Sequence, residues 1–166
     1  ALIWDGRPCL PFSVNQIWID HDRFSAAQDA AHIAEIAARC QALSAAGEVY
    51  YVLFLTGTEG IKSLADWTDQ TYRTKIEAEW KKFAPAVAGP GLRGMTFYNE
   101  INALRIGGIS IPDAAAVLNG YARSMKQIVG DVPVLLKIVG NCNISHALAA
   151  IAGDSIDGMG GDFFSE

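Results

Sequence analysis

Polar side chains follow each apolar stretch that the sequence predicts to be a strand. Carboxylates and amides dominate this polar rim, whose members are Asp20, His21, Asp22, Thr56, Thr58, Glu59, Asn99, Glu100, Asn102, Asn141, Asn143, Asp162 and Glu166. A sugar hydroxyl can donate a hydrogen bond to a carboxylate and accept one from an amide, so the rim suits a neutral, hydroxyl-rich ligand. It suits phosphates poorly.

The segment 94–100, GMTFYNE, is the most informative, because Asn99 and Glu100 directly follow its apolar residues. It resembles the end of the fourth strand in clan A glycoside hydrolases, the retaining (β/α)8-barrel enzymes in which an Asn-Glu pair closes that strand. The preceding stretch 80–89, WKKFAPAVAG, is similar to the family's approach to that strand. The opening DGRP at 5–8 is similar to the short hairpin that often precedes the first barrel strand.

The resemblance implies that this chain cleaves a β-linked saccharide with retention. Glu100 would be the general acid/base that protonates the leaving oxygen, and Asn99 would hydrogen-bond the hydroxyl next to the anomeric carbon. We expect Trp18, near a strand end, to stack on a sugar ring and Asn141 to contact the substrate. No cofactor or metal is expected. A second interpretation of Glu100 is a solvated acid at a strand end, or a cap for the next turn.

Apolar patterning predicts five strands joined by helices. The strands cover 10–19, 49–55, 92–98, 132–139 and 156–164, and the helices cover 25–46, 64–83, 110–129 and 143–151. This alternation requires right-handed crossovers and a mainly parallel sheet. The fold class is therefore α/β, either a partial (β/α)8 TIM-like barrel or a five-stranded doubly wound parallel sheet. A sequential strand order favours the barrel, and a reversal favours the doubly wound sheet.

The strand count departs from the family's pattern. Two strands precede Asn99 where the family has three, and the chain stops near the family's sixth strand. The retaining mechanism needs a second carboxylate about 5 to 5.5 Å from the first, and the family places it on the seventh strand. Glu166 is the only candidate by chain order, so either a longer parent protein supplies the nucleophile or this piece is inactive alone. The open edges of such a partial barrel call for self-association or a complementary fragment.

Length and composition favour one α/β domain spanning 1–166, either by itself or as a fragment of a longer barrel. The net charge of −5 comes from 18 acidic and 13 basic residues without a basic run, which argues against a nucleic-acid partner. The apolar runs are short and interrupted, which argues against a membrane span.

Several residue types that often carry chemistry have simpler interpretations here. Cys9, Cys40 and Cys142 match no zinc or redox spacing, and Cys40 falls on the apolar stripe of a helix. Trp67 and Trp80 lie at helical spacing with other apolar residues, which favours core packing. A flavodoxin-like domain that binds a ligand or a protein without catalysis is the alternative function.

Overall fold

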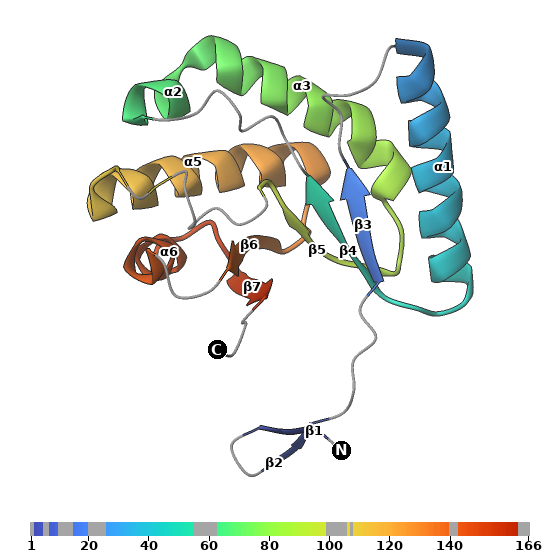
Figure 1. Cartoon of the computed structure of the whole chain (residues 1–166). Helices are drawn as coiled ribbons and strands as arrows, with labels where there is room; N and C mark the ends of the chain where they lie inside the picture. Colours follow the sequence, from blue (N-terminus) through green and yellow to red (C-terminus); the bar gives the residue numbers. More distant parts are fainter. Residues whose placement is uncertain are drawn as a thin grey trace.

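The computed structural model describes residues 2–4, 7–9, 15–19, 26–54, 63–98, 106, 108–139 and 143–162. Strands and helices alternate along this part of the chain (Figure 1). The elements are β1 (Leu2–Trp4), β2 (Arg7–Cys9), β3 (Asn15–Ile19), α1 (Ala26–Ala45), β4 (Tyr50–Phe54), α2 (Leu64–Thr68), α3 (Gln70–Val87), β5 (Leu92–Thr96), α5 (Ile111–Val129), β6 (Val134–Val139), α6 (Ile144–Ile151) and β7 (Gly158–Asp162).

The main sheet has five strands in the order β3-β4-β5-β6-β7, and all neighbouring pairs are parallel. This confirms an α/β fold built from alternating βα units, and the strand order follows the chain without a reversal. β1 and β2 form a separate antiparallel pair, so the hairpin expected at the start of the chain is present.

One face of the sheet is covered by helices. Ile17, Val52, Met95 and Val134 pair in register across β3 to β6, and each is fully buried in the core. Each long helix packs against the next along the chain, α1 on α3, α3 on α5 and α5 on α6. Figure 1 shows these helices in an arc around the strands.

Capping residues set the helix boundaries. The Ser110 hydroxyl accepts from Asp113 N at the start of α5, and Gly130 ends that helix with a φ of +84°, which glycine adopts without strain. Both limits were predicted. At the start of α2, Ser63 and Asp66 form a capping box.

The helix expected over 64–83 is two helices. Asp69 has an extended backbone, ends α2, and caps α3 by accepting a hydrogen bond from Tyr72 N. The predicted helix ended at residue 83, but α3 contains Pro85 and continues to Val87. A proline near a helix end removes only one late backbone hydrogen bond, so the helix tolerates it.

Other boundaries differ by a few residues from those predicted. Strand β5 ends at Thr96 because Phe97 and Tyr98 turn into the helix layer, and β6 begins at Val134. Asn143 precedes α6 with a left-handed φ of +49°, and its side chain makes no capping hydrogen bond to the helix. Residues 10–14 of the first predicted strand and residues 163 and 164 of the last lie outside the described part of the chain. None of the described helices is both long and apolar enough to cross a membrane.

Candidate functional site

The face of the sheet opposite the helices carries one row of paired side chains. Trp18, Leu53, Thr96 and Leu135 are in register across β3, β4, β5 and β6. Lys137 lies on the same face two residues further along β6, because side chains alternate along a strand. We call these five residues the inner face. Trp18, Leu53 and Thr96 lie at or next to the carboxyl ends of their strands, where parallel α/β sheets bind ligands, whereas Leu135 and Lys137 lie further back along β6.

Lys137 reaches Trp18 across the sheet. Its Nζ lies 5.4 Å from the centroid of the indole ring, within the range of a cation–π interaction. Strands β4 and β5 lie between the two residues, so in a flat sheet their backbones would be about 14 Å apart at roughly 4.8 Å per strand. The contact therefore depends on the length of both side chains, which extend toward each other over β4 and β5.

The inner face combines a flat ring with buried polar groups. Trp18 is 44% exposed, whereas Thr96 is 5% and Lys137 is 7% exposed. The Thr96 hydroxyl is buried and has no hydrogen-bond partner among the described residues. A buried hydroxyl of this kind normally finds a partner, so it suits a contact with a ligand hydroxyl. The chemistry of this group is thus stacking beside hydrogen-bond donors.

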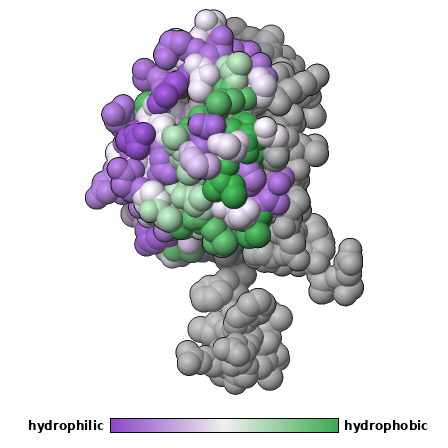
Figure 2. Space-filling view, turned by 90° about the vertical axis from the view of Figure 1, so that its left-hand side faces the viewer, coloured by the Kyte–Doolittle hydropathy of each residue, from purple (hydrophilic) through white to green (hydrophobic). Residues whose placement is uncertain are grey.

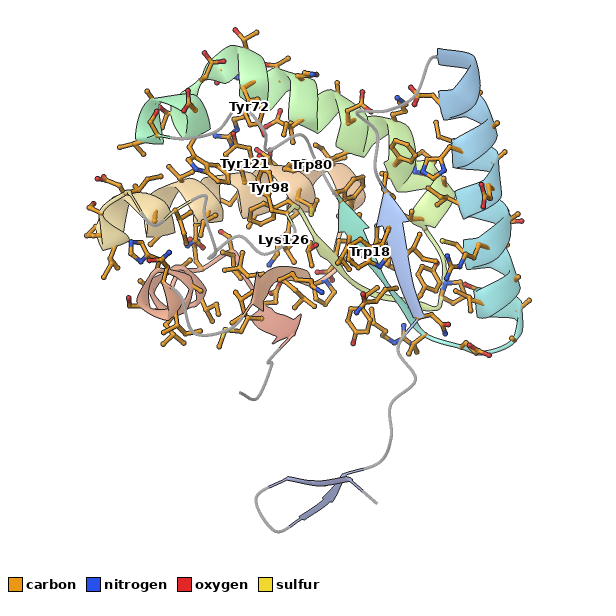
Figure 3. The ribbon with its side chains drawn as sticks, viewed as in Figure 1. Trp18, Tyr72, Trp80, Tyr98, Tyr121 and Lys126 are labelled. Atoms are coloured by element: carbon orange, nitrogen blue, oxygen red, sulfur yellow. The ribbon has the colours of Figure 1, made fainter. Side chains whose placement is uncertain are left out.

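An aromatic cluster fixes the chain as it leaves β5. Tyr98 packs edge-on against Trp67 at 4.8 Å between ring centroids, and its hydroxyl lies 2.7 Å from the Tyr72 hydroxyl (Figure 3). Tyr121 on α5 donates its hydroxyl to Trp67 O at 3.0 Å. Burial raises the pKa of Tyr121, so this donor stays protonated. These contacts hold the chain in a fixed position at Tyr98.

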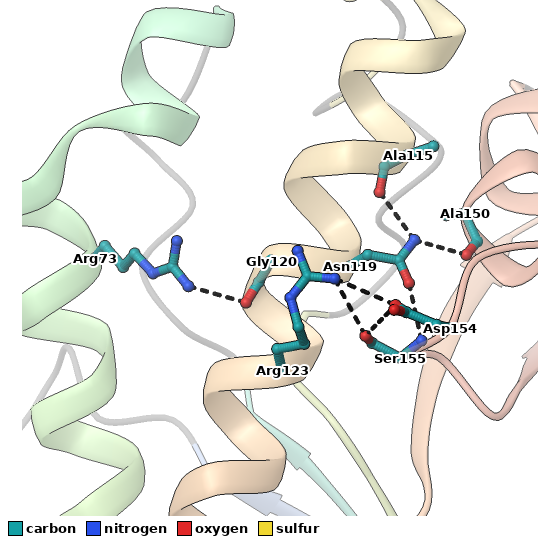
Figure 4. Close-up of polar contacts among 8 residues, drawn as sticks. All are labelled: Arg73, Ala115, Asn119, Gly120, Arg123, Ala150, Asp154 and Ser155. Carbon is teal, nitrogen blue, oxygen red and sulfur yellow. Dashed lines mark hydrogen bonds and ion pairs between the residues drawn. The ribbon is translucent and has the colours of Figure 1, made fainter.

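Polar contacts between α5 and the segment after α6 hold the last βα unit (Figure 4). The Asn119 amide donates to Ala115 O and Ala150 O, and its oxygen accepts from Ser155 N. Arg123 pairs with Asp154 at 3.2 Å. All hydrogen-bonding positions of the Asn119 head group except one acceptor site are used, so this residue is structural.

Asp157 fastens the start of β7 to β6 and α5. One of its oxygens accepts from Val134 N at 2.7 Å, and Lys126 Nζ lies 2.9 Å from the carboxylate. Partial burial opposes ionisation, but the ammonium and the backbone N–H outweigh it and hold the pKa of Asp157 below its ordinary value of 3.8. The carboxylate is therefore a structural anion.

Among the predicted site residues, Trp18 lies on the inner face, one residue before the end of β3, and its stacking on a sugar ring stays a prediction. The expected acid/base Glu100, its neighbour Asn99, the substrate contact Asn141 and the nucleophile candidate Glu166 lie outside the described residues. Their roles stay predictions.

Sequence reasoning missed Lys137 and Thr96. A signal for Lys137 exists, because it is a lone charge in the apolar run VLLKIV of β6. Thr96 gives no such signal, since only the register with Leu53 and Leu135 places it on the inner face.

Other expectations meet the structure directly. Trp67 and Trp80 are buried in the core, as predicted, and so is Cys40, whose thiol pKa is raised by burial. His146 Nε2 lies 2.8 Å from Ile109 O. No group of three or more metal-ligating side chains occurs within the described ranges.

Comparison with known proteins adds no relative. No protein-family model matches the sequence, and no curated protein matches it.

Proposed function

We propose that this chain is a glycoside hydrolase-like domain that binds a β-linked saccharide on the inner face and cleaves it with retention. The observation that carries the proposal is the half-exposed Trp18 ring with Lys137 beside it and the Thr96 hydroxyl in the same row. Sugars stack their apolar faces on indole rings, while buried donors select their hydroxyl oxygens.

In this proposal Glu100 is the general acid/base. Its carboxylic acid gives a proton to the leaving oxygen while a carboxylate attacks the anomeric carbon, which forms a glycosyl-enzyme and releases the alcohol. Glu100 then takes a proton from water as that water displaces the carboxylate. Asn99 hydrogen-bonds the neighbouring hydroxyl as the ring flattens. Glu166 or a residue outside this chain supplies the nucleophile.

The strand order supports a partial (β/α)8 barrel as the architecture behind this site. A barrel keeps its strands in chain order and its helices outside, and the order β3 to β7 is sequential. The consecutive packing of α1, α3, α5 and α6 agrees with an outer ring of helices. The meeting of Trp18 and Lys137 is consistent with an inner face that curves.

The second candidate is a non-catalytic, flavodoxin-like domain that binds a ligand or a protein. A five-stranded, all-parallel sheet with alternating helices is the observation in its favour, since doubly wound domains of this size share it. Such a domain would bind its partner without any turnover that depends on Glu100.

Titration of a β-linked oligosaccharide, followed by calorimetry, tests the binding half of the proposal. Trp18→Ala should abolish measurable affinity, because it removes the stacking ring. The matched control is Ile111→Ala, which removes a side chain of similar exposure, 40%, from the start of α5. Equal affinity of the Trp18→Ala variant and the unaltered chain would overturn the saccharide site on the inner face.

A further inference from the structure

A cavity lies at the end of the sheet where the strands begin, opposite to their carboxyl ends. It has a volume of about 270 Å³ and is bordered by the last turns of α3 and α5, the start of β5 and the turn before β6. Helices α3 and α5 pack against each other and run in the same direction, so their last turns meet there (Figure 1). Most of the lining is apolar, with Val87, Met95, Val129 and Val132 among its larger side chains.

Arg93 of β5 lines this cavity, and two backbone contacts hold its guanidinium in place. Its Nη1 donates to Pro90 O at 2.8 Å and to Leu92 O at 3.2 Å. These bonds leave Nε and Nη2 without a partner among the described residues. Nε and Nη2 together form the side of a guanidinium that binds a carboxylate through two parallel hydrogen bonds. Because Arg93 is also exposed, it provides an anion site that a ligand can reach.

Asp131 places the opposite charge at the same cavity. It follows Gly130, which ends α5, and its exposed carboxylate has no hydrogen-bond or ion-pair partner within the part of the chain that the structure describes. Asp131 and Arg93 both line the cavity, yet no ion pair joins them. The carboxyl ends of α3 and α5 add the negative ends of two helix dipoles. A positive group of a ligand is therefore favoured beside Asp131.

The hollow between α5 and α6 does not offer free charges of this kind. Figure 2 shows apolar surface on the side of the molecule where α5 and α6 lie. The charged residues that line that hollow, Arg123 and Asp154, pair with each other at 3.2 Å. Its Asn119 amide is held by backbone contacts. The cavity between α3 and α5 is therefore the better candidate for a ligand site.

We propose that the cavity between α3 and α5 binds a small zwitterion with an apolar body, of the class of the free α-amino acids. Arg93 donates from Nε and Nη2 to the carboxylate of the ligand, and Asp131 accepts from its ammonium group. The apolar side chain of the ligand lies against Val129 and Val132. The cavity volume of about 270 Å³ agrees with a ligand of this size, because it is just below the range of about 300–1,000 Å³ typical of pockets for larger molecules.

An NMR titration of the isotope-labelled full chain with leucine tests this proposal. Leucine should bind with a dissociation constant of about 1 mM or lower and shift the amide signals of Arg93 and Asp131. Arg93→Gln and Asp131→Asn should each weaken the affinity about tenfold or more, because each removes one charged partner of the ligand. The matched control is Arg39→Gln, which removes the same charge from an exposed position of α1 and should leave the affinity unchanged.

Two analogues of leucine test the two charges separately. Isocaproate lacks the ammonium group and isoamylamine lacks the carboxylate, so each should bind at least about tenfold more weakly than leucine. Asp131→Asn should not weaken the binding of isocaproate, and Arg93→Gln should not weaken the binding of isoamylamine. This comparison in the unaltered chain needs no substitution, so it tests the site even where a variant unfolds.

Three results would overturn the proposal. The first is a chain that does not bind leucine, and the second is an affinity for leucine that is the same in Arg93→Gln, Asp131→Asn and the unaltered chain. The third is an analogue that binds as tightly as leucine. Thermal unfolding of the two variants should change little, because both side chains are exposed.

Discussion

Lys137 Nζ lies 5.4 Å from the centre of the Trp18 ring, although the two residues are on β6 and β3 with two strands between them. The pair brings a stacking surface and a cation together in one place on the inner face.

The first prediction concerns Lys137. Lys137→Met keeps the length and apolar stem of the side chain but removes the charged donor, so the affinity for a β-linked oligosaccharide should fall about tenfold or more. Titration calorimetry measures it. The control is Lys81→Met, which removes a lysine charge from the exposed side of α3. An affinity equal to that of the unaltered chain would exclude a contact between Lys137 and the sugar.

The second prediction concerns Asn99. Its hydrogen bond to the sugar should tighten as the ring flattens, so Asn99→Ala should lower kcat by far more than it raises KM. Steady-state kinetics on an aryl β-glycoside separate the two constants. A raised KM with unchanged kcat, or no effect on either, would make Asn99 a structural amide.

The third prediction concerns Asn119, whose amide joins α5 to Ala150 of α6 and to Ser155. Asn119→Ala leaves Ser155 N without its side-chain acceptor and removes one of the donors to Ala150 O, so the free energy of unfolding should fall by about 1–3 kcal/mol. Urea unfolding measures it. Asn15→Ala is the control, because Asn15 makes its hydrogen bonds at an exposed position, and it should change stability by less than about 0.5 kcal/mol. An equal loss of stability in the two variants would show that the hydrogen bonds of Asn119 stabilise the fold no more than those of an exposed asparagine.

The fourth prediction is a pH dependence. Because the pKa of Asp157 is lower in the folded chain than its ordinary value of 3.8, its contribution to stability is present above that value. The contribution is lost as the pH falls through the folded pKa. The stability of the unaltered chain should therefore decline more steeply under acid than that of Asp157→Asn, in unfolding curves recorded at successive pH values.

The exposed Asp131 supplies the control for that experiment, since Asp131→Asn alters an acid of the same type in the turn before β6. This variant should follow the unaltered chain. If the free energy of unfolding falls equally with pH in Asp157→Asn and in the unaltered chain, the contacts of Asp157 with Lys126 and Val134 contribute nothing to stability.

Much of the fold was predictable because its signals are local. The hydroxyl of Ser110, the positive φ of Gly130 and the continuous apolar run of β4 each define an element within a few residues. The break at Asp69 escaped prediction because apolar residues keep a helical spacing on both sides of it. A capping aspartate inside such a pattern looks like any other polar residue.

The site was less predictable because its members are brought together by strand pairing. Trp18 was identified from its place near a strand end, but its contact with Lys137 depends on the register through β4 and β5. A short stretch of sequence contains no signal for that register. Glu100, Asn99 and Asn141 lie outside the described residues, and the reaction assigned to them stays a proposal.

The most direct test of that proposal is the hydrolysis of two aryl β-glycosides, one with a good leaving group and one with a poor one. A general acid matters most when the leaving oxygen is basic, so Glu100→Gln should lower kcat/KM by about 10²- to 10⁴-fold on the poor leaving group and by much less on the good one. Glu35→Gln, on the exposed side of α1, is the matched control and should leave both rates unchanged. Rates for Glu100→Gln that equal those of the unaltered chain on both substrates would contradict the account.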